Sequence, residues 1–114
     1  MRLMQIPRGN NKMRITLQQK NDLKHKLISC LRSNQEIVKI VIFGSFVHSD
    51  NPHDIDVAVF QDSSEGYLPL AMKYRIRTEE IAKIMPLDIL PLKSKVKTDP
   101  FLAEIAKGEV IYER

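Results

Sequence analysis

The chain has 114 residues, a mass of 13.2 kDa and a formal net charge of +4. This length accommodates one small domain and leaves no room for a second hydrophobic core. Cys30 is the only cysteine, which excludes an intramolecular disulfide and a cysteine-based zinc site. The mild positive charge is compatible with a polyphosphate, nucleic-acid or acidic-protein ligand. No apolar stretch approaches the ~20 residues of a membrane helix, so we expect a cytoplasmic protein that contacts no membrane.

The N-terminal part predicts a basic tail followed by a long helix. We expect residues 1–12 to form a flexible basic tail and residues 13–114 to form a single domain. Thr16 is suited to cap a helix over residues 17–33, in which apolar residues recur at helical spacing and Cys30 lies on the buried stripe. The charged residues of this helix are mostly basic, which fits either a solvated outer face or a surface that binds RNA or a partner.

The rest of the chain alternates apolar runs with turn signals. The run IVKIVIF at residues 37–43 is β-branched and nearly continuous in apolarity, which predicts a buried strand. Beyond it we expect a strand over 54–60, a helix over 67–84 ended by Pro86, a strand over 87–90, a helix from 99 or 100 to Gly108, and a short edge strand over 109–112. This order predicts a small α/β (α+β) domain, a mixed β-sheet with helices packed on it.

The segment after the first strand combines a Gly-Ser turn with two spaced aspartates. Gly44 and Ser45 follow the strand directly, and a glycine there allows a sharp turn and a close approach to a ligand. Asp54 and Asp56 open the next predicted strand. Because successive side chains of a strand point to opposite faces, the two carboxylates emerge on the same face. They repel each other and are costly to desolvate, and a bound divalent cation would offset both costs.

A third acid, Asp88, interrupts the apolar run at residues 87–90 with the same alternation. Each aspartate also has a purely structural interpretation. Asp54 could cap a turn, Asp56 could pair with a lysine on a neighbouring strand, and Asp88 could lie at a solvated strand end. Together, the three aspartates and the Gly-Ser turn favour a metal-dependent site for phosphoryl or nucleotidyl transfer.

The combination of Gly44-Ser45, Asp54-Ile55-Asp56 and Asp88 resembles the signature of the nucleotidyltransferase superfamily related to DNA polymerase beta. The small size and the ending EIAKGEVIY at residues 104–112 are similar to the minimal nucleotidyltransferases of bacteria and archaea. Members of that group are often the antitoxin partner of a helical toxin of the HEPN type. The resemblance covers most of the chain from about Ile37 onward.

This resemblance implies a role for each residue of the signature. Asp54 and Asp56 would hold two Mg²⁺ ions, and Asp88 would join the metal on the acceptor side and help to deprotonate the attacking hydroxyl. Gly44 and Ser45 would bind the β- and γ-phosphates of ATP or another nucleoside triphosphate. A two-metal site of this kind stabilises both the attacking and the leaving oxygen.

The chain departs from the family pattern directly after the Gly-Ser pair. Many relatives carry Gly-Ser-x-Ala-Arg-Gly, whereas the last four places are here filled by Phe46, Val47, His48 and Ser49. An arginine is a permanent cation, but a histidine is only partly charged near neutral pH. His48 is therefore the candidate to contact phosphate in place of the arginine. Alternatively, His48 has a role outside the site.

Two functions remain open from the sequence. The first is a Mg²⁺-dependent enzyme that moves a nucleoside monophosphate, AMP from ATP above all, to a hydroxyl on a partner protein or an RNA. The second is a catalytically weak or silent antitoxin that neutralises a HEPN-type toxin by binding it. A stand-alone nucleic-acid binder would explain the basic helix but not the aspartates. A homodimer or a complex with the partner would cover an apolar face that so small a domain leaves open.

Overall fold

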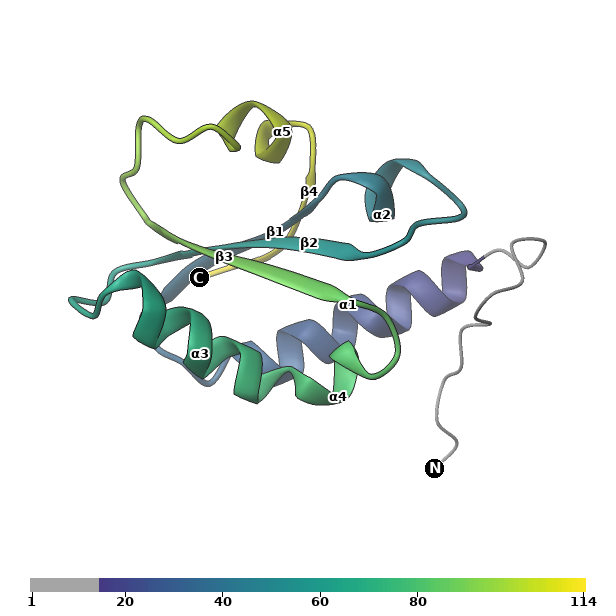
Figure 1. The fold of residues 1–114 in the computed structure, drawn as a ribbon, viewed down its shortest axis with the longest axis horizontal. Helices are drawn as coiled ribbons and strands as arrows, with labels where there is room; N and C mark the ends of the chain where they lie inside the picture. The colour runs from purple at the N-terminus through teal and green to yellow at the C-terminus, as the bar shows by residue number, and fades with distance from the viewer. Residues whose placement is uncertain (1–14) are drawn as a thin grey trace.

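The computed structural model describes residues 15–114, so the predicted tail at residues 1–12 lies outside the described residues. The elements follow one another as shown in Figure 1. They are α1 (Leu17–Leu31), β1 (Ile37–Phe43), α2 (Ser45–His48), β2 (Ile55–Gln61), α3 (Tyr67–Arg77), α4 (Glu79–Ala82), β3 (Leu87–Lys93), α5 (Leu102–Ala106) and β4 (Glu109–Glu113). None of these helices has the length and apolar character needed to cross a membrane.

The four strands form one mixed sheet in the order β3-β2-β1-β4. β1 runs antiparallel to both β2 and β4, and β2 runs parallel to β3. α1, α3 and α4 cover one face of the sheet, and the short α5 lies over part of the other face (Figure 1). The predicted class, a small mixed sheet with helices packed on it, is confirmed.

α1 begins where the sequence predicts, because Thr16 and Gln19 form a reciprocal cap. Thr16 Oγ1 accepts a hydrogen bond from the Gln19 N–H at 3.0 Å, and Gln19 Oε1 accepts one from the Thr16 N–H at 2.8 Å. These bonds satisfy two backbone donors that the first turn leaves free. The helix ends at Leu31, two residues before the predicted end. Cys30 is half-buried at the edge of the core rather than fully buried within it.

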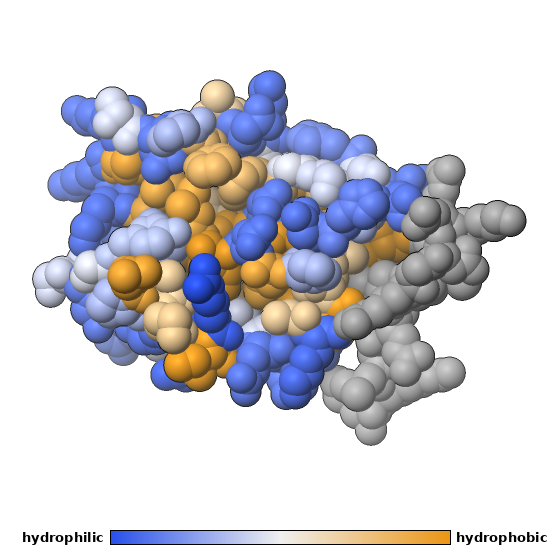
Figure 2. Space-filling model, viewed as in Figure 1, coloured by the Kyte–Doolittle hydropathy of each residue, from blue (hydrophilic) through white to orange (hydrophobic). Residues whose placement is uncertain are grey.

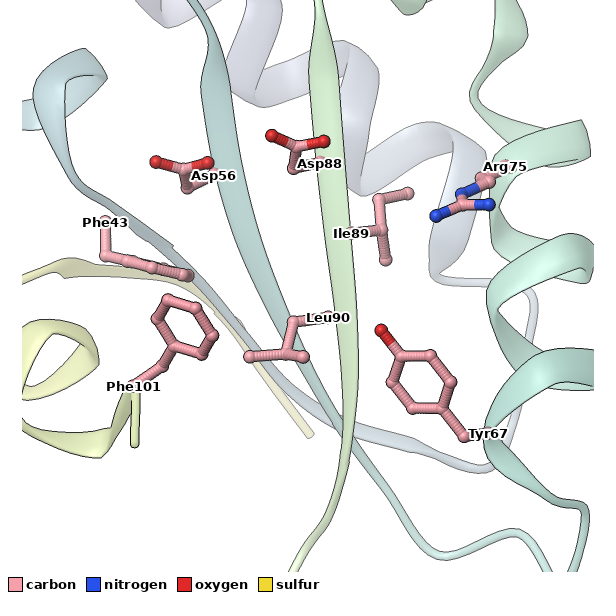
Figure 3. A pocket seen from close by; sticks show the side chains of 8 residues that line it. All are labelled: Phe43, Asp56, Tyr67, Arg75, Asp88, Ile89, Leu90 and Phe101. Atoms are coloured by element: carbon pink, nitrogen blue, oxygen red, sulfur yellow. The ribbon is translucent and has the colours of Figure 1, made fainter. Parts of the chain in front are cut away.

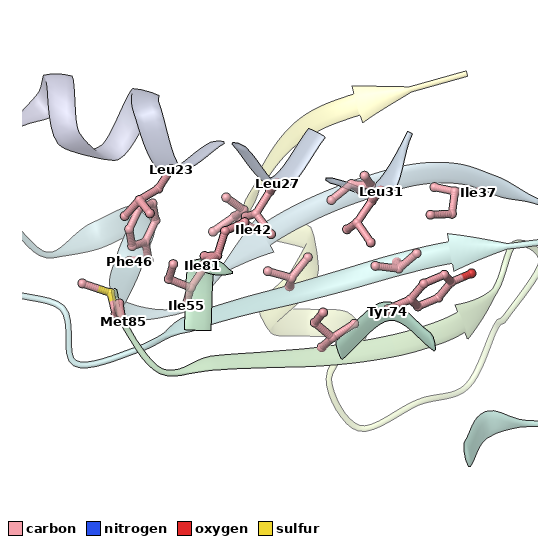
Figure 4. Packing of buried hydrophobic residues seen from close by; sticks show 14 of the residues in the cluster. Leu23, Leu27, Leu31, Ile37, Ile42, Phe46, Ile55, Tyr74, Ile81 and Met85 are labelled. Carbon is pink, nitrogen blue, oxygen red and sulfur yellow. The ribbon is translucent and has the colours of Figure 1, made fainter. Parts of the chain in front are cut away.

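The main core lies between the helices and the sheet (Figure 4). α1 contributes Leu23, Leu27 and Leu31, all fully buried at helical spacing. α3 contributes Tyr74, which is fully buried although it carries a hydroxyl. A smaller cluster on the opposite face joins the sheet to α5; its buried members are Val41, Phe43, Ala58, Phe60, Leu92 and Ile105.

The single helix predicted over residues 67–84 is wrong, because the chain forms two helices that meet at Thr78. The backbone of Thr78 has φ −111° and ψ 14°, outside the helical region. Its hydroxyl donates to the carbonyl oxygen of Tyr74 at 2.7 Å. A threonine that bonds back to the preceding turn competes with the helical ladder and bends or ends it. Both helices contribute to the main core, Leu70 and Tyr74 from α3 and Ile81 from α4.

Other predicted boundaries move by one to three residues. The strand predicted over 87–90 continues to Lys93. The last helix begins at Leu102, and Asp99 accepts a hydrogen bond from the Phe101 N–H at 2.8 Å just before it. Aspartate side chains commonly fix such turns before a helix.

β3 is an edge strand, and it contains a proline at a harmless position. The Ile55 N–H donates to the Pro86 oxygen, and the Ser94 N–H donates to the Gln61 oxygen, both at 2.9 Å. In a parallel ladder these bonds determine which residues of β3 direct their backbone groups toward β2. Even-numbered residues of β3 therefore bond to β2, and odd-numbered residues turn their backbone groups outward. Pro91 has an outward position, where its missing N–H costs the sheet no bond.

Candidate active site

Three aspartates converge at one end of the sheet. Asp54 directly precedes β2, and Asp56 and Asp88 are the second residues of β2 and β3. The α3–α4 crossover allows these two strands to run parallel, and Asp56 pairs with Asp88 in their register. Paired residues point to the same face, so the two carboxylates lie side by side (Figure 3). One carboxylate oxygen from each of the three aspartates lies within 4.8 Å of the other two.

Asp56 experiences the strongest electrostatic stress in this cluster. Burial, together with the charges of Asp54 and Asp88, raises the pKa of Asp56 to about 6. Within residues 15–114, no cation or hydrogen-bond donor pairs with any of the three carboxylates. Converging carboxylate oxygens without a protein partner are the ligands that Mg²⁺ prefers. The three side chains therefore fit a divalent cation, whose charge would offset their repulsion.

Gly44 connects β1 to α2 and touches the aspartate cluster. Its φ is +78°, a conformation that residues with a side chain rarely adopt. A Cβ at this position would lie 2.5 Å from Oδ2 of Asp56. Glycine is thus required both by the turn and by the approach of the carboxylate. The Gly-Ser turn and the aspartates, separate motifs in the sequence, form one site.

α2 is anchored to the core by its second residue. Phe46 is fully buried, and Lys20 of α1 lies with Nζ 5.4 Å from the centre of its ring. The same ammonium group donates to the carbonyl oxygen of Ser49 at 2.6 Å, which fixes the end of the short helix. Ser45 and His48 are both exposed. Ser45 directly follows the glycine and so lies beside the cluster, whereas His48 is the last residue of α2.

A cavity of about 340 Å³ opens beside the aspartates (Figure 3). Phe43 and Phe101 face each other on one side, with ring centres 6.3 Å apart, and α3 supplies the other side. This volume is in the range of small-molecule pockets. The residues that line the cavity are Phe43, Asp56, Tyr67, Arg75, Asp88, Ile89, Leu90 and Phe101. His48, a predicted phosphate contact, is not one of them.

Sequence reasoning did not single out Arg75 or Phe101. In the sequence, Arg75 is an ordinary basic residue of an exposed helix face, and Phe101 is one apolar residue near a helix start. No local pattern marks either residue. They reach the aspartates through tertiary packing, since α3 packs beside β3 and α5 packs on β1.

The convergent aspartates, the glycine turn and the adjoining cavity match the arrangement that we expect of a nucleotidyl-transfer domain. The family described as "Polymerase beta, Nucleotidyltransferase" matches residues 25–114, and the chain belongs to this family. The family resemblance seen in the sequence is thereby confirmed.

The comparison with solved structures places the fold among known proteins. A chain of the solved structure titled "Crystal structure the toxin-antitoxin MntA-HepT" superposes with a TM-score of 0.54 at 19% identity. The match covers 82% of this chain and 73% of that chain. At this identity the likeness concerns the fold. The search of curated proteins found no match.

Proposed function

We propose that this chain is a Mg²⁺-dependent nucleotidyltransferase that moves AMP from ATP to a hydroxyl group on a partner protein. The observation that carries the proposal is the convergence of Asp54, Asp56 and Asp88 within 4.8 Å, with no neutralising partner in the described part of the chain. A purely structural role does not account for three uncompensated carboxylates, one of which has a pKa raised to about 6 by burial and by its two neighbours.

The proposed chemistry divides the site into two sides. In the sheet order, Gly44 follows β1, Asp56 lies on β2, and Asp88 lies on the edge strand β3. Gly44 and Ser45 hold the terminal phosphates, and His48 lies at the outer end of the same short helix. Asp88 faces the cavity and receives the acceptor.

The transfer forms a bond between the acceptor oxygen and the α-phosphorus of ATP. The bond from the α-phosphorus to the bridging oxygen breaks, pyrophosphate leaves, and the hydroxyl proton passes to Asp88. Two Mg²⁺ ions held by the aspartates would lower the negative charge that the acceptor oxygen meets and stabilise the pyrophosphate. The protein itself orients the phosphates at the Gly44 turn and excludes water on the side closed by Phe43 and Phe101.

A protein acceptor fits this small domain, because the cavity that residues 15–114 form beside the aspartates is open to a side chain of another molecule. The related fold in a toxin–antitoxin structure supports a protein partner as well. By analogy, the partner is a helical toxin, and the chain acts as its antitoxin.

Calorimetry of ATP binding, with and without Mg²⁺, tests the proposal. The wild type is expected to bind ATP in the presence of Mg²⁺, and the double variant Asp54→Asn/Asp56→Asn is expected to lose this binding while its thermal unfolding stays cooperative. Asp22→Asn is the matched control, since this acid lies on α1 and bonds to Gln18. Metal-independent binding, or binding that survives the double change, would show that the aspartates are not the site.

A second candidate function is a binding module that neutralises the toxin without catalysis. His48 in place of the family's arginine favours it, because a histidine does not supply the permanent charge and the forked donors with which an arginine binds phosphate. Neutralisation by such a module is unaffected by Asp54→Asn/Asp56→Asn. Neutralisation by nucleotide transfer is abolished by the same change, so the double variant separates the two functions.

A further inference from the structure

The outer side of α3 carries an apolar stripe that nothing in residues 15–114 covers. Leu68, Met72 and Ile76 recur at intervals of four residues and are 71%, 54% and 63% exposed. Side chains four apart lie on one side of a helix, so the stripe runs for about 12 Å along α3. The opposite side of the helix is buried through Leu70 and Tyr74. Apolar groups also reach the surface in the middle of the face shown in Figure 2.

The stripe adjoins the cavity through Arg75. This residue directly precedes Ile76 and lies three positions after Met72, so it is next to the stripe on the helix surface. In Figure 3 its side chain extends from α3 toward the β3 edge, on the side where Asp88 lies. Among residues 15–114, its guanidinium group makes no ion pair and no hydrogen bond. Arg75 is thus a cation without a partner at the border between the catalytic cavity and an uncovered apolar surface.

Arg75 lies on the acceptor side of the site. The order across the sheet is the Gly44 turn, Asp56 on β2, Asp88 on β3, and then Arg75 on α3. A triphosphate at the Gly44 turn is separated from Arg75 by the aspartates. The anion that Arg75 meets therefore belongs to the acceptor.

We propose that α3 is the docking helix for the acceptor protein. An apolar segment of the partner packs on Leu68, Met72 and Ile76, and a carboxylate close to the acceptor hydroxyl pairs with Arg75. This inference rests on the proposed function and adds the surface and the chemistry that select the acceptor. Aliphatic side chains favour a protein over a nucleic acid as the occupant, because they neither neutralise phosphates nor stack on bases as aromatic rings do.

Labelling with ATP carrying a tagged α-phosphate, in the presence of Mg²⁺, tests this inference on defined probes. The first probe is an amphipathic peptide with apolar residues at intervals of four and a tyrosine flanked by glutamates. The second has lysines in place of those glutamates, and the third is a single-stranded RNA oligonucleotide. The protein variants are Met72→Glu and Arg75→Glu. The control is Arg77→Glu, an exposed residue of the same helix that does not line the cavity.

The acidic peptide is expected to have a kcat/KM about tenfold higher than the basic peptide, a difference of about 1.4 kcal/mol. Arg75→Glu reverses this preference, and Met72→Glu raises the KM of the acidic peptide about tenfold while the KM of ATP changes far less. Arg77→Glu behaves as the wild type. Because a charged residue placed on an exposed helix face leaves packing intact, cooperative unfolding of all three variants is expected and is measured alongside.

Each other outcome overturns the inference in a distinguishable way. Labelling of the RNA in preference to both peptides shows that the acceptor is a nucleic acid. An Arg75→Glu variant that raises the KM of ATP places this arginine on the nucleotide side. If light scattering shows that the wild type is a dimer and that the Met72→Glu variant is a monomer, a second copy of the chain covers the stripe. Absence of Mg²⁺-dependent ATP binding in the wild type refutes the proposed function itself, and this inference with it.

Discussion

The carboxylate of Asp56 lies so close to Gly44 that a Cβ on the glycine would be 2.5 Å from Oδ2. The glycine also has a φ of +78°. Gly44→Ala therefore meets two obstacles, the backbone conformation and the carboxylate. We expect a loss of about 1–2 kcal/mol in the free energy of unfolding and a loss of Mg²⁺-dependent ATP binding, because Asp56 must move to make room.

Gly66→Ala is the matched control for this change. Gly66 precedes α3 with a φ of −74°, and a Cβ there would meet only the Cδ of Pro69, at 3.8 Å. This variant should unfold within about 0.5 kcal/mol of the wild type and bind ATP normally. Equal effects of the two substitutions would mean that the contact between Gly44 and Asp56 does not matter.

Asp56→Asn is expected to stabilise the metal-free protein near neutral pH. The pKa of Asp56 is about 6 in the fold, raised by burial and the neighbouring charges from 3.8. The folded state therefore holds the proton more tightly than the unfolded state, so wild-type stability falls as the pH rises from about 4 to above 6. The stability of Asp56→Asn should not fall over this pH range, because an asparagine carries no charge to repel its neighbours.

At neutral pH, Asp56→Asn should raise the free energy of unfolding by on the order of 1 kcal/mol, since the Asp56 side chain is only half-buried and solvent screens part of the repulsion. Urea unfolding in the presence of a chelator, at pH 4.5 and at pH 7.5, measures it. A difference between variant and wild type that does not grow with pH would contradict the electrostatic origin.

Mg²⁺ itself should stabilise the wild type. A ligand that binds only the folded state adds stability in proportion to the logarithm of its concentration over Kd, or about 1.4 kcal/mol at tenfold excess over Kd. The midpoint of thermal unfolding should therefore rise with Mg²⁺ for the wild type and for Asp22→Asn. It should not rise for Asp54→Asn/Asp56→Asn, and a Mg²⁺-dependent rise in that variant would place the metal elsewhere.

Tyr74→Phe should weaken the fold, most clearly above pH 4.5. The Tyr74 hydroxyl donates to Oε2 of Glu36 at 2.9 Å, and Lys73 pairs with the same oxygen at 2.9 Å. Burial favours a raised pKa for Glu36, but these two partners outweigh it and lower the pKa below 4.5. Stability from this group is present above pH 4.5 and is lost as the pH falls through the lowered value.

Removing the hydroxyl should cost about 1–2 kcal/mol at pH 7, with a smaller loss in acid, because Glu36 takes up a proton as the pH falls through its lowered pKa. Tyr112→Phe is the control, because the Tyr112 hydroxyl makes no hydrogen bond to residues 15–114. Chemical unfolding at pH 7 and pH 3.5 compares the two variants. If Tyr74→Phe were as stable as Tyr112→Phe at both pH values, the hydrogen bond from Tyr74 to Glu36 would not stabilise the fold.

The aspartate cluster could be predicted because it depends on short-range rules. The two-residue period of a strand places Asp54 and Asp56 on one face, and the same alternation at Asp88 suggested a third member. The parallel pairing of β2 with β3, which brings Asp88 beside Asp56, follows from a helix between two strands. The strand bounds moved by at most three residues.

The break at Thr78 and the cavity wall could not be predicted in the same way. Threonine occurs within many helices, and whether its hydroxyl ends the helix depends on how the following residues pack on the sheet. Arg75 and Phe101 come from elements whose positions are set by tertiary packing over residues far apart in the sequence. Their sequence neighbours give no sign of a site. The residues of the cavity wall therefore became visible only in three dimensions, while the aspartate cluster could be predicted from the sequence.

Pro91 has a consequence for how this domain behaves in a crowded cell. Asp88, one of the three clustered aspartates, lies on the edge strand β3, and the proposed transfer requires this edge to stay open to the acceptor. An open edge invites strands of other molecules to pair with it and to extend the sheet into aggregates. With a proline at an outward position, the edge lacks a donor in its middle, so a second strand cannot form an uninterrupted ladder along it. The protein can thus keep the β3 edge accessible without becoming a template for fibre growth.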